Sequence, residues 1–329
     1  MEKIIEIFRT LQSRATHIEE GYLIVRLPLI KTHKLGISES GEPLFFIKCQ
    51  GTAKDVLLDC NLESFSVQYN RECQLLNDTK KEIGTYTIIS LKNDSINLQE
   101  YFLEIVYLII QKLEECPKLL ALKVEIDKLI DLFSKFSKPA VKTIQGVWTE
   151  LFIIEKSTSP DYLIQSWHTS ILDKFDFNDG IDKIEVKSTS KVKRIHNFSF
   201  EQLNSNDSSN LIVVSVFVIQ VGLGKSILNL IESIEQKLRD KSMSLRLREI
   251  VGQTLGDDFK KSFDIYYDYQ LAMDTIQCYR KEDIPTINSD AIPTSISHVK
   301  FECDLTNVIP VTENIYQSPL HYSLFQDFK

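Results

Sequence analysis

The sequence lacks the marks of an exported, membrane-bound or zinc-binding protein. Its six cysteines form no CxxC pair or Cys/His cluster, and the two nearest, Cys49 and Cys60, are eleven positions apart, so a zinc site is not expected. The longest apolar run, residues 211–219, is far shorter than the roughly 20 residues that a membrane helix requires. Residues 1–9 alternate charged and apolar side chains, unlike a signal peptide. We therefore expect a cytoplasmic protein with reduced thiols and no membrane partner.

An excess of positive charge is also missing, because the formal net charge is −8. This balance looks unfavourable for a protein that binds nucleic acid. Affinity for phosphate, however, comes from local clusters of lysine and arginine, whereas net charge only tunes the long-range field. With 43% hydrophobic and 26% charged residues, 11 glycines and 9 prolines, the composition is that of a folded globular protein. Nucleic-acid binding therefore depends on where the basic residues lie.

The chain of 329 residues is long enough for two domains, and its pattern changes near residue 137. Before that point a short opening helix precedes β-branched and aromatic segments, which predict strands over 22–27, 43–49, 64–69 and 84–91. Apolar residues at helical spacing then predict helices from about 97 and over 118–136. Ser137-Lys138-Pro139 interrupts this pattern. We predict an N-terminal β-rich and helical domain of unassigned role over 1–137, and a second domain with a C-terminal extension over 138–329.

The second domain alternates helices and strands in a specific order. The pattern predicts a helix over 140–156, strands over 164–168, 171–177 and 181–188, a helix over 199–204 and a strand over 211–220. Asp179-Gly180, between the second and third of these strands, is a hairpin turn signal. A helix over 225–239, a helical stretch over 257–274 and a strand over 297–305 follow. We therefore expect an α+β protein whose second domain has an αβββαβ core.

The segment with the clearest chemistry covers residues 175–189, Phe-Asp-Phe-Asn-Asp-Gly-Ile-Asp-Lys-Ile-Glu-Val-Lys-Ser-Thr. Strand periodicity puts Glu185 and Lys187 on one face and the apolar residues between them on the other. Asp176, on the neighbouring arm of the hairpin, can direct its carboxylate to the same point, and the backbone carbonyl of Val186 can join it. Mg²⁺ prefers such oxygen ligands, and it can lower the pKa of a water that attacks a phosphodiester. The segment therefore indicates a metal-dependent phosphodiesterase.

A purely structural interpretation of the same residues remains open. An alternating Ile-Glu-Val-Lys strand is typical of a half-exposed strand with a surface ion pair. Asp179 and Asp182 flank Gly180 and are expected to be turn residues, whereas Asp173 is the next candidate if the register differs.

The motifs around this segment resemble a known family. The Asp-x8-Glu-x-Lys spacing is similar to that of the PD-(D/E)xK nuclease superfamily, although Phe175 stands where the motif has proline. More narrowly, residues 146–305 resemble the bacterial PD-(D/E)xK motif proteins, which are associated with restriction and other phage-defence gene clusters. The resemblance rests on Gly146-Val-Trp-Thr-Glu-Leu151, Trp167-His168, residues 175–177 and 184–189, the Arg194-Ile-His-Asn-Phe-Ser-Phe-Glu-Gln-Leu203 segment and residues 279–285 and 299–305.

The resemblance implies roles for individual residues. Asp176 and Glu185 would bind Mg²⁺, for which Mn²⁺ could substitute, and Lys187 would activate water or stabilise the transition state. Glu150 matches an auxiliary acidic residue on the helix before the sheet, although the helical stripe makes Glu155 a competing candidate. DNA contacts are expected from the loop and helix after the catalytic strand, at Lys191, Lys193, Arg194, His196 and Gln202.

The resemblance also implies partners: double-stranded DNA, a methyltransferase or ATPase of the same system, and a second copy of the chain. Two alternatives remain. The chain could be a non-catalytic DNA-binding or assembly subunit with a nuclease fold, or a nuclease directed at RNA. A nucleotide-binding P-loop is not expected at Val221-Gly-Leu-Gly-Lys-Ser226, because Ile219 stands where that motif requires its first glycine.

Overall fold

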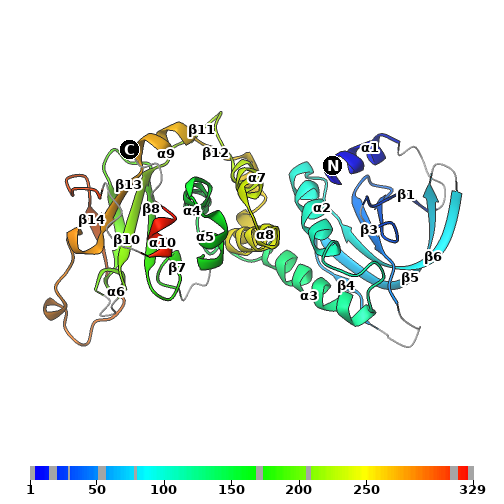
Figure 1. Ribbon diagram of the computed structural model, residues 1–329, viewed down its shortest axis with the longest axis horizontal. Coiled ribbons are helices and arrows are strands. Elements are labelled where there is room, and N and C mark those ends of the chain that lie inside the picture. Colours follow the sequence, from blue (N-terminus) through cyan, green and yellow to red (C-terminus); the bar gives the residue numbers. More distant parts are fainter. Residues whose placement is uncertain are drawn as a thin grey trace. The chain divides into compact units, whose positions relative to one another are not determined.

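The computed structural model describes residues 4–14, 21–28, 30–50, 57–77, 80–167, 173–204, 209–311 and 318–324. The chain divides into two compact units, Met1–Lys138 and Pro139–Lys329, which we call the N-terminal and C-terminal units (Figure 1). The division lies beside the Ser137-Lys138-Pro139 segment at which the sequence pattern changes. Within the described ranges, every helix is too short or too polar to span a bilayer.

The N-terminal unit is built on a six-stranded sheet with the strand order β1-β2-β3-β6-β5-β4. Its strands are β1 (Tyr22–Arg26), β2 (Lys34–Ile37), β3 (Pro43–Ile47), β4 (Cys60–Asn61), β5 (Phe65–Asn77) and β6 (Lys80–Leu91). Because β1 also pairs in parallel with β5, the strands β1, β2, β3, β6 and β5 close into a ring. The four strands predicted in this unit correspond to β1, β3, β5 and β6, whereas β2 and β4 were not predicted.

Aromatic packing joins this sheet to its helices, which are α1 (Ile4–Arg14), α2 (Ile96–Ile110) and α3 (Leu119–Lys135). Phe65 of β5 stacks on Phe133 of α3 with ring centroids 4.6 Å apart. Phe102 of α2 lies 5.8 Å from Phe45 of β3 by the same measure. The apolar stripes that predicted α2 and α3 therefore face the sheet and form the core of this unit.

The C-terminal unit has a four-stranded sheet in the order β13-β10-β8-β7. The strands are β7 (Phe177–Asn178), β8 (Lys183–Thr189), β10 (Leu211–Phe217) and β13 (Gln277–Arg280). β10 runs parallel to β8, and the other two pairs are antiparallel. The apolar sequence Leu-Ile-Val-Val-Ser-Val of β10 is buried throughout, as expected for a central strand covered on both faces.

Helices cover one face of this sheet in two shells. Figure 1 shows α4 (Ile144–Lys156) and α5 (Pro160–Ser166) next to the strands, with α7 (Ile227–Lys237) and α8 (Ser242–Leu255) outside them. Trp148 of α4 is fully buried, stacks on Phe152, and donates from Nε1 to the carbonyl oxygen of Lys225 at 2.9 Å. The described part of the unit also contains α6 (Phe200–Leu203), α9 (Tyr269–Thr275) and α10 (Pro319–Tyr322).

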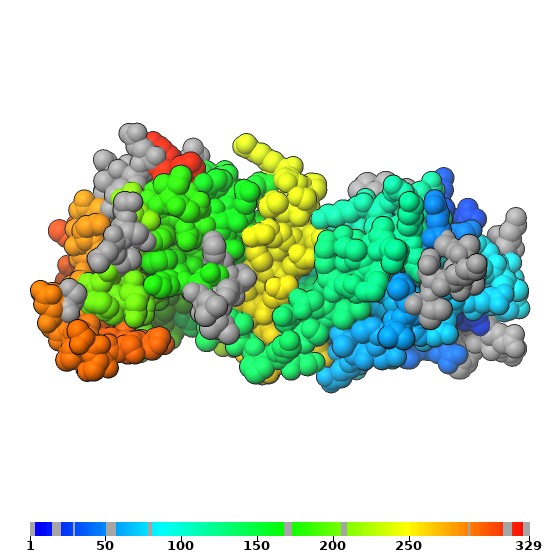
Figure 2. All heavy atoms as spheres, turned by 90° about the horizontal axis from the view of Figure 1, so that it is seen from below, coloured from blue at the N-terminus to red at the C-terminus, as the bar shows by residue number. Residues whose placement is uncertain are grey.

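Two short antiparallel ribbons lie beside the main sheet. One pairs β11 (Gln220–Val221) with β12 (Tyr266–Tyr267), and the other pairs β9 (Ile195–Ser199) with β14 (Lys300–Asp304). Figure 2 shows the residues near 300, in orange, against those near 200, in light green. The amide of Phe200 donates to the carbonyl oxygen of Val299 at 2.8 Å at the end of this ribbon. The β9–β14 ribbon therefore ties a distant part of the chain to the segment that follows β8.

The predicted α+β class is confirmed, but several predicted elements are wrong. Of the strand expected over 164–168, residues 164–167 are instead the end of α5 and a bridge at Trp167, because Pro160 starts a helix at its first position, and residue 168 lies outside the described ranges. Of the strand expected over 171–177, residues 171–172 lie outside the described ranges, and only β7 at its end is a strand. The stretch over 257–274 contains two 3₁₀ turns, β12 and most of α9 rather than one helix. β9 and α8 were not predicted.

Candidate active site

A tight hairpin between β7 and β8 sets the register of the candidate site. Gly180 adopts a positive φ of 88°, a conformation that glycine reaches without the steric cost of a side chain. Asp179 Oδ1 accepts hydrogen bonds from the amides of Ile181 and Asp182, both at 2.8 Å. Phe177 pairs with Ile184, so the residue preceding β7 lies opposite Glu185. The turn signal at Asp179-Gly180 is confirmed, and it brings Asp176 beside the strand that carries the Glu-x-Lys motif.

Asp176, the residue before β7, caps the edge of β8 beyond the last β7–β8 pair. Its Oδ2 accepts a hydrogen bond from the amide of Val186 at 2.8 Å, and its Oδ1 lies 2.5 Å from Nζ of Lys142. In an extended strand the N–H and C=O of one residue face the same edge. The carbonyl oxygen of Val186 therefore faces the edge at which Asp176 lies.

Glu185 and Lys187 lie on one face of β8, as strand periodicity requires. Glu185 Oε1 is 2.6 Å from Lys187 Nζ, and the glutamate is 5% exposed. Burial, and then the nearby charge of Asp176, raise the pKa of Glu185 to about 7, even though the ammonium of Lys187 opposes this shift. By the register of the hairpin, the residue before Phe177 lies opposite Glu185, so Asp176 and Glu185 occupy facing positions on neighbouring arms.

Glu150 reaches the same region from α4. Its Oε1 lies 2.7 Å from Lys142 Nζ, and its Oε2 accepts a hydrogen bond from Trp167 Nε1 at 2.6 Å. Burial and the charge of Asp176 raise the pKa of Glu150 to about 8. Trp167 therefore fixes the orientation of this carboxylate.

The competing glutamate on the same helix, Glu155, is directed elsewhere. It contacts Ser233 and Lys237 of α7, and it accepts a hydrogen bond from the hydroxyl of Tyr269 at 2.7 Å. Of the two acids considered on α4, only Glu150 contacts the region around Asp176.

Lys142 belongs to this cluster but was not predicted from the sequence. It precedes the N-cap residue of α4, Thr143, and its backbone amide lies near the carbonyl oxygen of Thr254, which also accepts from Val141 at 2.8 Å. Burial would lower the pKa of Lys142, but the carboxylates of Glu150 and Asp176 outweigh it and raise that pKa above its usual range. Nothing in the local sequence indicates this role, because Asp176 is 34 positions away.

The donor set suits a hard divalent cation. Carboxylate oxygens come from Asp176, Glu185 and Glu150, and the carbonyl oxygen of Val186 faces the edge of β8 at which Asp176 lies. Mg²⁺ accepts both kinds of oxygen ligand. Crowded, buried carboxylates also favour any cation that relieves their repulsion. Among the residues that the structure describes, no three His, Cys, Asp or Glu side chains already surround a common metal position. In this arrangement the ammonium of Lys142 takes the place between Glu150 and Asp176.

The residues expected to contact DNA differ in exposure: Lys191, Lys193 and Gln202 are accessible at least in part, whereas Arg194 and His196 are buried. Lys191 and Lys193 are exposed on the loop after β8, with Lys193 Nζ 3.9 Å from Asp304. Gln202 is engaged in the capping box of α6, accepting from the Ser199 amide at 3.0 Å and donating to the Lys174 carbonyl oxygen at 2.8 Å.

Arg194 and His196 are buried in the same part of the unit. Arg194 donates to the carbonyl and hydroxyl oxygens of Ser215 at 2.9 and 2.8 Å, and His196 Nε2 lies 2.7 Å from the same hydroxyl. Burial, followed by the charges of Lys187 and Arg194, lowers the pKa of His196 to about 4. These two side chains are used within the fold, where they join β9 to β10.

The glycine-rich segment over 221–226 is a structural turn. Lys225 exchanges backbone hydrogen bonds with Tyr267, both at 3.1 Å, and its Nζ lies 3.6 Å from the ring centroid of Tyr269. Ser226 is the N-cap of α7 and forms a capping box with Asn229. The glycines therefore serve the pairing of β11 with β12 and the start of a helix.

Comparison with known proteins relates the chain to a family. A family model described as "Putative PD-(D/E)XK family member, (DUF4420)" matches residues 4–306, nearly the whole chain. No curated protein and no solved structure matches.

Proposed function

The chain belongs to the DUF4420 family, and from this membership and the geometry around Asp176 we propose that it is a Mg²⁺-dependent endonuclease that hydrolyses DNA phosphodiester bonds. The αβββαβ core is part of this proposal. In it, β9 provides a third strand that pairs with β14 outside the main sheet.

The observation that carries the proposal is the meeting of acids and an amine at the open edge of β8. Asp176 bonds to the Val186 amide, Glu185 pairs with Lys187 at 2.6 Å, and Glu150 reaches in from α4. A surface ion pair does not require burial, yet Glu150 and Glu185 are 3% and 5% exposed. Burying carboxylates costs free energy unless a cation compensates them, so such a cluster is more typical of a functional site than of a structural strand.

Each residue has a role that follows from its position. Asp176, Glu185 and the Val186 carbonyl would hold Mg²⁺ or Mn²⁺, with Glu150 as an auxiliary acid. When bound, the metal would stabilise charge on the phosphate and lower the pKa of the attacking water. Lys187, held beside Glu185, would orient that water and stabilise the negative charge that develops. Hydrolysis would form a new P–O bond from water, break the bond to the 3′ oxygen, and leave a 5′-phosphate and a 3′-hydroxyl.

The partners proposed for this activity go beyond the catalytic geometry. We propose double-stranded DNA as substrate, contacted in part by Lys191 and Lys193, and a role in a bacterial restriction or phage-defence system beside a methyltransferase or ATPase. Arg194 and His196 are left out of the proposed DNA contacts because both are buried. The N-terminal unit would recognise the target or a partner, and the chain would act alone or as a homodimer.

Cleavage of supercoiled plasmid by the full chain, with Mg²⁺ or Mn²⁺ and with EDTA, tests the proposal. We expect metal-dependent nicking or linearisation that falls at least about 100-fold in Asp176→Ala and Lys187→Ala. Asp257→Ala, an exposed acid on a 3₁₀ turn, is the matched control and should cleave normally. Metal-independent cleavage, or equal cleavage by all three variants, would contradict the assignment.

The two alternatives give different results in the same assay. A non-catalytic DNA-binding subunit would bind the plasmid without cutting it under any metal condition. An RNA-directed nuclease would cut a structured RNA of equal length in preference to DNA, with the same dependence on Asp176 and Lys187.

A further inference from the structure

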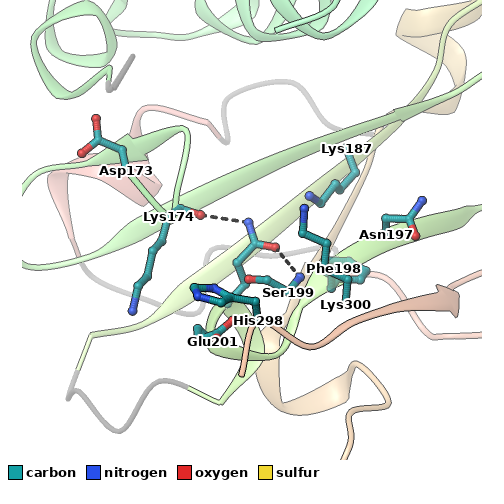
Figure 3. A pocket seen from close by; sticks show the side chains of 10 residues that line it. Asp173, Lys174, Lys187, Asn197, Phe198, Ser199, Glu201, His298 and Lys300 are labelled. Carbon is teal, nitrogen blue, oxygen red and sulfur yellow. Dashed lines mark hydrogen bonds between the residues drawn. The ribbon is translucent and has the colours of Figure 1, made fainter. Parts of the chain in front are cut away.

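A pocket of about 640 Å³ opens beside Lys187, on the side of β8 that faces the β9–β14 ribbon (Figure 3). Its volume lies in the range of ligand-binding clefts and exceeds what a single phosphate needs. The lining residues come from β8, β9, α6, β14 and the segments before β7 and β14, and they are Asp173, Lys174, Lys187, Asn197, Phe198, Ser199, Glu201, Gln202, His298 and Lys300.

The walls of this pocket are fixed by contacts within the fold. Gln202 bridges the Ser199 amide and the Lys174 carbonyl oxygen, as the dashed lines in Figure 3 mark. Phe198 is 1% exposed, and Lys187 Nζ lies 5.2 Å from its ring centroid. A preformed cavity of this kind loses little conformational entropy when a ligand binds.

One wall contains a residue in an uncommon backbone conformation. His298, just before β14, has a φ of 56°, a left-handed value that non-glycine residues seldom adopt. The hydrogen bond from Phe200 to Val299, directly beside it, fixes the backbone at this point. Such conformations persist where the surrounding structure imposes them, and they cluster at ligand sites.

The amines of the pocket are arranged as an anion site. Figure 3 shows the amine ends of Lys187 and Lys300 directed into the same part of the pocket, with Lys174 at the far rim. Lys174 and Lys300 are exposed, and the described residues offer neither of their Nζ atoms an ion pair or hydrogen bond. The carboxylate of Asp173 is directed away from the two converging amines. Lys187 is already paired with Glu185 at 2.6 Å, so the ammonium of Lys300 adds a second positive charge that this pair does not balance, and this excess favours an anion.

We propose that this pocket binds the sugar-phosphate backbone of one nucleic-acid strand, next to the phosphate that is cleaved. Lys300 contacts the phosphate adjacent to the one at Lys187, and Lys174 contacts a further phosphate at the rim. This inference rests on the proposed nuclease function, because Lys187 is the group that connects the pocket to the catalytic cluster. The β9–β14 ribbon thereby serves as the wall that guides the strand across the edge of β8.

Binding of fluorescent single- and double-stranded oligonucleotides tests the inference, measured in EDTA so that no cleavage occurs. We expect Lys300→Ala and Lys174→Ala each to weaken binding about 3- to 10-fold. Each should also reduce the slope of log affinity against log salt by about one, the amount expected for one lost phosphate contact. Both side chains are exposed, so neither substitution should disturb folding. Lys241→Ala is the matched control, because Lys241 is an exposed lysine at the start of α8, a helix that contributes no lining residue to the pocket.

Three results would overturn the inference. The first is unchanged affinity and salt slope in both lysine variants, and the second is an equal loss of affinity in Lys241→Ala. The third is complete displacement of the oligonucleotide by inorganic phosphate at a concentration equal to that of the oligonucleotide's phosphates. The last result would indicate an isolated anion site. The binding measurement can fail or succeed independently of the cleavage assay that tests the nuclease proposal. If lysine-dependent binding occurs without cleavage, only the nuclease proposal fails, whereas cleavage with unchanged binding by the variants removes only the pocket proposal.

Discussion

Nζ of Lys142 lies 2.5 Å from Oδ1 of Asp176, and the same ammonium lies 2.7 Å from Glu150. The two carboxylates come from elements far apart in the sequence, and the lysine is the cation that compensates both. A divalent ion held by Asp176 would occupy part of the space that the Lys142 ammonium now fills. It would also take over part of the charge compensation that this ammonium provides. On the proposed function, an incoming metal ion would therefore have to displace this ammonium from the two carboxylates.

Lys142→Met is expected to bind Mn²⁺ and Mg²⁺ more tightly than the unaltered chain. Removing the ammonium frees one oxygen of Asp176 and one of Glu150, while methionine keeps most of the length of the unbranched side chain. Isothermal titration calorimetry without nucleic acid should show an increase of about 10-fold in affinity, which corresponds to about 1.4 kcal/mol.

The control for this measurement is Lys138→Met, an exposed lysine four positions upstream, which should leave metal affinity unchanged. Equal or weaker metal binding by Lys142→Met would show that the lysine supports the site instead of competing for it. Far-ultraviolet circular dichroism of both variants distinguishes this outcome from a loss of fold.

The hairpin and its three motif residues were predictable because their information is local. Period-two alternation places Glu185 and Lys187 on one face, and Asp179-Gly180 sets the turn that returns Asp176 to them. The contacts of Lys142 could not be predicted in this way. Its carboxylate partners lie 8 and 34 positions away, and only the docking of α4 against the β7–β8 hairpin brings them together.

Burial accounts for the contacts of Arg194 and His196, which the sequence predicted to be with DNA. Arg194 and His196 lie in a basic segment that looks solvated, yet both turn toward Ser215 of the buried strand β10. A lone serine in an apolar strand was the available signal, because a buried hydroxyl requires hydrogen-bond partners. The strand predicted over 164–168 failed for a local reason, since Pro160 and Asp161 favour the first turn of a helix over a strand.

Glu155→Gln should destabilise the C-terminal unit in a pH-dependent manner. Burial would raise the pKa of Glu155, but hydrogen bonds from Lys237, Tyr269 and Ser233 dominate and lower it to about 2. A carboxyl whose pKa is lowered by folding stabilises the fold above its unfolded pKa of about 4.3, and this contribution disappears as pH falls toward 2. The variant should therefore lose about 2 kcal/mol at pH 7 and progressively less below pH 4.

Urea unfolding followed by tryptophan fluorescence measures this effect in the correct unit, because both tryptophans, Trp148 and Trp167, belong to the C-terminal unit. Glu232→Gln, on the exposed face of α7, is the control and should unfold like the unaltered chain at each pH. A loss of the same size at pH 7 and pH 3 would show that the carboxylate's charge contributes nothing.

Gly224→Ala should disrupt the turn between β11 and α7, whereas Gly222→Ala should be tolerated. A Cβ at position 224 would lie 2.2 Å from the carbonyl oxygen of Tyr267, a backbone atom that exchanges hydrogen bonds with Lys225 and cannot move alone. A Cβ at position 222 meets no atom within 4 Å among the described residues. We expect the free energy of unfolding to fall by about 1–3 kcal/mol in the first variant and by less than about 0.5 kcal/mol in the second, measured by urea unfolding.

Tryptophan emission gives a second measurement of the same turn. Because Trp148 Nε1 donates to the Lys225 carbonyl oxygen, Gly224→Ala should also shift the tryptophan emission of the folded chain. Equal stability of the two variants would mean that the turn is not held against β12, and the glycine-rich segment would then be free to take another role.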